Sequence, residues 1–215
     1  GLITGGLLNL GYDPGYTATV TATGTGHEIS ATVGLGNNTA FSVTNAADRL
    51  LVSGPISGGY SLTKTGTGTL ELTGANTYTG ATTITSGTVR IAGSAGALSP
   101  SSAISGSAGA LLVFNRSGSI AQGTGFGSIG GDLAVTQLGP GTVTLVASNA
   151  YTGLTTVSAG VLALGANDSV PNASGLVVNG GGFNVATYDD TVASVVLTSG
   201  SIYGTTGTLS SVTDY

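Results

Sequence analysis

The chain has 215 residues, a formal net charge of −5 at pH 7 and no cysteine, which excludes disulfides, thiolate metal sites and cysteine nucleophiles. It is 40% hydrophobic and only 6% charged, a composition that folds rather than stays disordered. No basic cluster is present to neutralise phosphates, and no apolar run reaches about 18 residues, so we expect no nucleic-acid partner and no helical membrane span in this chain.

Residues 1–48 come first and lack the repeat that follows. We predict that they form an N-terminal β region, a cap or assembly segment, in which "YTATVTATGTGHEISATVGLG" (16–36) makes two strands around a glycine-rich turn. The apolar "GLITGGLLNL" could pair with the strand edge of a neighbouring molecule. Its candidate assembly residues are Leu2, Ile3, Leu7, Leu8 and Leu10.

Two later stretches have similar sequences at an offset of 73 residues: "GTGTLELTGANTYTGATTITSGTVRI" (66–91) and "GPGTVTLVASNAYTGLTTVSAGVLAL" (139–164). We therefore predict one repeat over 49–121 and a second repeat with further C-terminal coils over 122–215. The repeated residues that we assign a structural role are Gly66, Gly68, Asn76, Tyr78, Gly80, Gly87, Gly139, Gly141, Asn149, Tyr151, Gly153 and Gly160.

Within each repeat, apolar and polar residues alternate, as in "TLELT" and "TVRIA", and glycine-rich turns separate these short segments. This pattern predicts β-strands, and no stretch shows helical periodicity. A sandwich needs no internal similarity, and a propeller needs four or more blades of about 40 to 50 residues. We therefore predict an all-β fold, a β-helix (β-solenoid) rod with about three coils per 73-residue repeat and about nine or ten coils in total.

The segment "LTKTGTGTLELTGANTYTGATTITSGTVRIA" resembles the autotransporter-associated β-strand repeat, also called the passenger-associated transport repeat. The resemblance is best over residues 53–98 and weaker over 126–170. It implies a β-helical stalk in a bacterial surface or secreted passenger, with an extracellular or cell-surface location. It implies no catalytic residues, because the repeat motif carries none.

Few residues offer chemistry. His27 is the only histidine, and no nucleophile elbow accompanies it, so catalysis there is the less favoured interpretation. Calcium could be bound by carboxylates, but turn roles fit them better: Asp132, Asp168, Asp189 and Asp190. As neighbours in a strand, Asp189 and Asp190 should face opposite sides and make a poor glycosidase pair. Asn76 and Asn149, with Tyr78 and Tyr151, could form a polysaccharide-binding row, but stacking between coils explains them more simply.

We therefore predict a non-enzymatic extracellular structural protein without cofactors or metal sites, a β-helical stalk or fibre building block. Its partners would be itself, by head-to-tail or lateral stacking, or flanking repeats of a longer chain. An adhesin module that binds host or glycan surfaces is the alternative, and a polysaccharide-active enzyme on a β-helix is the less favoured one.

Overall fold

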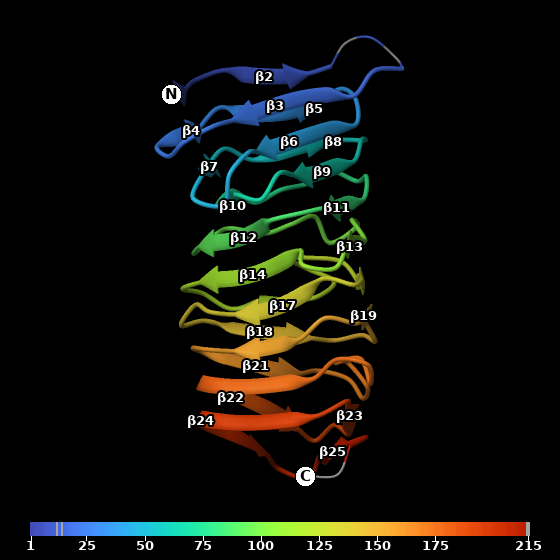
Figure 1. Ribbon diagram of the computed structural model, residues 1–215. Helices are drawn as coiled ribbons and strands as arrows, with labels where there is room; N and C mark the ends of the chain where they lie inside the picture. Colours follow the sequence, from blue (N-terminus) through green and yellow to red (C-terminus); the bar gives the residue numbers. More distant parts are fainter. Residues whose placement is uncertain (12, 14, 214–215) are drawn as a thin grey trace.

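The computed structural model describes residues 1–11, 13 and 15–213 as a stack of parallel β-strands. Residues 12, 14, 214 and 215, which fall in the first and last predicted regions, lie outside the described residues. Figure 1 shows the strands as successive rungs of a rod, with the two termini at opposite ends. The rod has about 10 turns of about 21 residues, and the described residues contain no helix. The predicted all-β solenoid is confirmed.

Each turn visits three sides of the rod in the same order. The first side carries β2 (Leu7–Leu10), β5 (Thr32–Leu35), β8 (Ile56–Gly58), β15 (Ile120–Ala121), β18 (Thr142–Leu145) and β21 (Val161–Leu164). The second side carries β3 (Ala18–Ala22), β6 (Thr39–Val43), β9 (Leu62–Thr65), β11 (Thr82–Ile84), β13 (Ile104–Gly106), β16 (Ile129–Gly131), β19 (Ala150–Tyr151), β23 (Asp190–Val192) and β25 (Leu209–Ser211).

The third side carries β1 (Leu2–Ile3), β4 (His27–Ile29), β7 (Arg49–Val52), β10 (Thr69–Leu72), β12 (Thr88–Gly93), β14 (Leu111–Arg116), β17 (Ala134–Gln137), β20 (Thr155–Val157), β22 (Leu176–Ala186) and β24 (Val195–Gly204). Strand β22 pairs with both β20 and β21, so it bends from the third side onto the first. This corner joins two sides of the rod into one sheet of 13 strands.

The first residues of the chain stack on the same rod. Strand β1 pairs with β4, and β4 pairs with β7, while β3 pairs with β6 on the second side. The segment predicted to hold two strands contains three, β3, β4 and β5, one for each side of a turn. The glycine-rich turn lies between β3 and β4, as expected.

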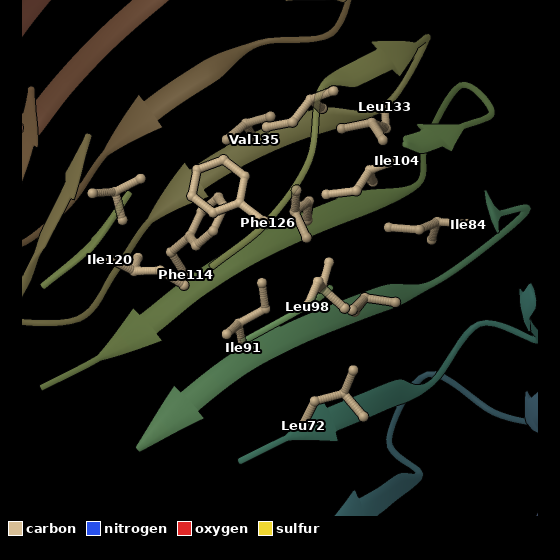
Figure 2. Packing of buried hydrophobic residues seen from close by; sticks show 14 of the residues in the cluster. Leu72, Ile84, Ile91, Leu98, Ile104, Phe114, Ile120, Phe126, Leu133 and Val135 are labelled. Carbon is tan, nitrogen blue, oxygen red and sulfur yellow. The ribbon is translucent and has the colours of Figure 1, made fainter. Parts of the chain in front are cut away.

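Alternate residues of each strand point into one continuous apolar core. In β11, Thr82 and Ile84 are fully buried while Thr83 lies on the outer surface, and β9 and β18 repeat this alternation. Figure 2 shows the core near the middle of the rod, with Phe114 and Phe126 side by side. Their ring centroids lie 4.8 Å apart, and the ring planes are inclined by 53°. Since each turn covers the apolar rows of its neighbours, stacking is what buries the core.

The 73-residue repeat spans three turns and one further side. On the second side, Leu62 pairs with Thr82, Thr82 with Ile104, and Ile104 with Ile129, which completes three turns. The counterpart of Leu62 at the repeat offset is Val135, which lies on β17 of the third side. The second copy is therefore rotated about the rod axis by one side relative to the first.

Candidate functional site

The repeated asparagines join three successive turns. Asn76 accepts a hydrogen bond from the Ile56 amide at 2.8 Å and donates one to the Ala97 carbonyl at 2.6 Å. Asn149 makes the same two bonds in the second copy, from the Ile129 amide and to the Ser169 carbonyl, each at 2.9 Å. The first partner lies in the preceding turn and the second in the following turn. Each asparagine thus satisfies backbone groups at a bend where the strand ladder is interrupted.

The repeated tyrosines are fully buried and end a short chain of hydroxyls. The Tyr78 hydroxyl bonds to Oγ1 of Thr82 at 2.5 Å, and Thr82 bonds to Oγ of Ser102 in the next turn at 2.9 Å. In the second copy Tyr151, Thr155 and Ser174 form the same chain, with both distances 2.8 Å. Burial raises the pKa of Tyr78 to about 12. These hydroxyls are therefore neutral connectors between turns, and neither ring is open to a sugar.

The repeated glycines lie where one turn touches the backbone of the turn before it. A Cβ on Gly80 would overlap the backbone of Tyr60, and one on Gly153 would overlap that of Leu133. The same overlap with the preceding turn holds for Gly66, Gly68, Gly87, Gly139, Gly141 and Gly160. Gly87 and Gly160 also have positive φ angles of 69° and 57°, which favour glycine.

Asp190 has a role like that of the two asparagines, which the sequence did not reveal: it was expected as a turn residue or a calcium ligand. Oδ2 of Asp190 accepts from the amides of Ser169 and Val170, at 2.9 and 3.0 Å, in the preceding turn. Its Oδ1 is buried and has no hydrogen-bond partner among the described residues, whereas the second polar atom of each asparagine is a donating amide nitrogen. Burial raises the pKa of Asp190 to about 6. The available signal was "DTV" (190–192), which matches "NTY" (76–78) in its polar and buried positions.

Three long polar side chains on the inside of bends donate to turn carbonyls. The Lys64 ammonium, fully buried, donates to the carbonyls of Thr65, Gly66 and Ser86, and burial lowers its pKa to about 8. Gln137, its counterpart at the repeat offset, donates to Gly139 and Gly141, each at 2.8 Å. Arg116 takes this role in a bend between the two copies of the motif.

The candidate catalytic residues are dispersed along the rod. The ring nitrogens of His27 lie 2.9 Å from the Gly1 amino group and 2.9 Å from the Thr23 carbonyl, so the ring bonds to no nucleophilic hydroxyl in the described residues. Asp132 is exposed and accepts a bond from the Thr152 hydroxyl at 2.8 Å. Asp168 is exposed in a turn with φ of 50°, a conformation that aspartate tolerates.

Asp189 and Asp190 point in opposite directions. Asp189 is exposed, and two hydrogen bonds from Thr208 lower the pKa of its carboxyl. Asp190 is only 2% exposed. They make no paired-carboxylate site, and within residues 1–11, 13 and 15–213 no group of three or more metal-ligating side chains comes together.

The predicted assembly residues lie at the N-terminal end of the rod. Leu2, Ile3 and Leu7 are 64%, 46% and 59% exposed, while Leu8 and Leu10 pack partly against the core. The opposite end also presents apolar side chains, since Val196 and Leu197 on β24 are 50% and 53% exposed. In the part of the chain that the structure describes, no helix has the length and apolar character to cross a membrane.

Comparison with known proteins matches the two copies of the motif. The family model of the passenger-associated-transport-repeat matches residues 62–91 and 135–164. These segments contain both asparagines, both tyrosines and the threonines that bond to them, while the serines that end the two hydroxyl chains lie just outside. The resemblance to this repeat family is confirmed.

A curated relative with the same kind of sequence is the adhesin BmaC autotransporter of Brucella suis biovar 1 (strain 1330). The two chains are 36% identical over 147 residues, which make up 66% of this chain and 4% of the adhesin. The chain thus spans a small fraction of the relative's length. No solved structure matches the chain significantly.

Proposed function

We propose that this chain, which contains two copies of the passenger-associated transport repeat, is a non-enzymatic β-helical stalk in a surface passenger. The repeat and the adhesin relative imply an extracellular or cell-surface location. The proposal rests on what the repeated polar side chains bind. Asn76 and Asn149 form hydrogen bonds to neighbouring turns. Tyr78 and Tyr151 bond to threonine hydroxyls that link one turn to the next. Residues with these roles maintain a rod.

The stalk proposal predicts that each molecule is a rigid rod in solution. Ten turns at about 4.8 Å per turn give a length of about 48 Å for the strand stack. Small-angle scattering of the purified chain should give this length, and a compact particle would contradict the proposal. Replacing His27, Asp189 and Asp190 together should leave any polysaccharide turnover by the preparation unchanged, whereas loss of turnover would support catalysis.

We further propose that the ends of the rod associate. Leu2, Ile3 and Leu7 at one end and Val196 and Leu197 at the other leave apolar side chains and strand edges open. Either flanking repeats of a longer chain or a second copy would cover them. The domain division at 48 and 121 remains part of this proposal, with residues 1–48 as the assembly segment.

Negative-stain electron microscopy over a concentration series tests head-to-tail association. Fibres that lengthen with concentration and vanish in Leu7→Lys would support a polymer building block. The matched control is Leu154→Lys, because Leu154 is 46% exposed but lies on the flank of the rod. Short dispersed rods at every concentration would show that flanking repeats, and not a second copy, cover the ends.

An adhesive surface is the second candidate, favoured by the adhesin relative alone. A glycan and host-protein array probed with the purified chain tests it, and no binder above background would count against adhesion by this segment.

A further inference from the structure

The ladder of the first side is interrupted in the middle of the rod. Ala97 pairs with Ala75 in the preceding turn, and β15 pairs with β18 in the following turn, but no strand pairing links Ala97 to β15 among the described residues. A hollow of about 420 Å³ lies at this interruption, and no carboxylate lines it. Its lining consists of Ala95, Ala97, Arg116, Ser119, Ile120, Ala121, Thr124, Gly125 and Thr144.

Arg116 holds the two turns together at this point. Its Nη2 donates to the Ser94 carbonyl at 2.6 Å and the Ser119 carbonyl at 3.3 Å, and its Nε donates to the Gly118 carbonyl at 3.4 Å. These bonds fix the guanidinium. A hollow of this volume suits a small group.

The Arg116 charge has no counter-ion within the described residues. The two other arginines, Arg49 and Arg90, both pair with Glu71, whereas Arg116 forms no ion pair with the described residues. Arg116 is only 8% exposed, and burial lowers its pKa. Its Nη1 makes no hydrogen bond with the described residues and is not among their fully buried unpartnered atoms, so it keeps some contact with solvent.

The rest of the hollow fits a sugar ring. Ser119 and Thr144 line it, and their hydroxyls donate to no described residue, so they can bond to sugar hydroxyls. Ala95, Ala97 and Ala121 provide short apolar walls that a ring C–H face can contact. One arginine balances one negative charge, which suits a carboxylate better than a doubly charged phosphate. Because Nη2 and Nε donate to turn carbonyls, Nη1 is the nitrogen left to meet the carboxylate.

We propose that this hollow binds an acidic monosaccharide unit, with its carboxylate on Nη1 of Arg116 and its hydroxyls on Ser119 and Thr144. A stalk needs no such ligand, so the inference goes beyond the proposed function and does not rest on it. The ring would lie on the outer surface of the first side, across the turns of Ala97, Ala121 and Thr144.

Titration of the purified chain with sodium glucuronate, followed by amide NMR spectra, tests the proposal. Glucose, which lacks the carboxylate, and acetate, which lacks the ring, are the matched probes. We expect glucuronate to bind at least about tenfold more tightly than either, with shifts confined to residues around the hollow. Equal binding of acetate would show a simple anion site, and either that result, equal binding of glucose or no binding of glucuronate would overturn the proposal.

Variants connect the binding to the named groups. Arg116→Gln keeps an amide donor for the turn carbonyls, as Gln137 does, and should lower glucuronate affinity at least about tenfold. Arg90→Gln is the control, because Arg90 lies outside the hollow, and its affinity should equal that of the wild type. Thr144→Val keeps the side-chain shape and should lower affinity about threefold to tenfold without unfolding the chain. Unchanged affinity in both Arg116→Gln and Thr144→Val would refute the site.

Discussion

Asp190 lies where both repeat copies have asparagine, and this difference should make the stability of the C-terminal turns depend on pH. Its Oδ2 accepts two backbone hydrogen bonds, whereas its Oδ1 is buried and finds no partner in the part of the chain that the structure describes. Burial raises the pKa of the carboxyl from 3.8 to about 6. The folded state therefore binds this proton more tightly than the unfolded state. The stabilising contribution of the protonated group is complete below pH 3.8 and is lost as the pH rises through about 6.

The change Asp190→Asn removes this titration and restores the amide donor found in Asn76 and Asn149. A pKa shift of about two units corresponds to at most about 3 kcal/mol of free energy of unfolding. We expect Asp190→Asn to raise the free energy of unfolding by about 1–3 kcal/mol above pH 6 and to change it little near pH 4. The decline in stability between these pH values should flatten.

Urea unfolding at several pH values, followed by circular dichroism, measures the whole transition. Native-state amide exchange at Val192 measures the C-terminal turns separately, because a solenoid can open from its ends. Asp189→Asn is the matched control, since Asp189 is exposed and its pKa is lowered by Thr208, so it stabilises the fold above its unfolded pKa. A pH dependence in Asp190→Asn identical to that of the wild type would refute the argument.

Three pairs of substitutions test the repeat. Tyr78→Phe and Tyr151→Phe should each lower the free energy of unfolding by about 1 kcal/mol, since each loses one buried hydroxyl bond. Clearly different losses for the two variants in urea unfolding would contradict the shared role. Lys64→Gln should stay within about 1 kcal/mol of the wild type because Gln137 makes the equivalent bonds, whereas Lys64→Met should lose about 2 kcal/mol; equal melting temperatures for the two variants would count against this. Gly153→Ala should cost more than about 3 kcal/mol because its Cβ overlaps the Leu133 backbone, and Gly59→Ala, with no atom near its Cβ, should be neutral in thermal melts.

The strands, the repeat and the stacked rod could be predicted because each depends on local pattern. Alternation in "TTI" (82–84) places Thr82 and Ile84 inside and Thr83 outside, and the structure has this arrangement. The contacts of Asn76 with neighbouring turns could be predicted from its place in a bend alone. These features follow from side-chain period and turn chemistry within a few residues.

Features that depend on the register between turns could not be predicted. The turns differ in length because loops of different size join their strands, so the sequence does not reveal that the repeat ends one side further round the rod. The bonds of Arg116 to Ser94 and of Asp190 to Val170 join residues about one turn apart, and nothing in the local sequence identifies these partners. The hollow arises from the same register.

The extra side in each repeat also sets the direction in which a longer stalk would display its surface. Corresponding residues in consecutive copies of equal length would be rotated about the rod axis by about a third of a circle. Three copies complete the circle after ten turns, about 48 Å along the axis at about 4.8 Å per turn. A group carried once per repeat would therefore face every azimuth in succession. Such a stalk could meet partners from any direction, but a flat surface could engage only every third copy.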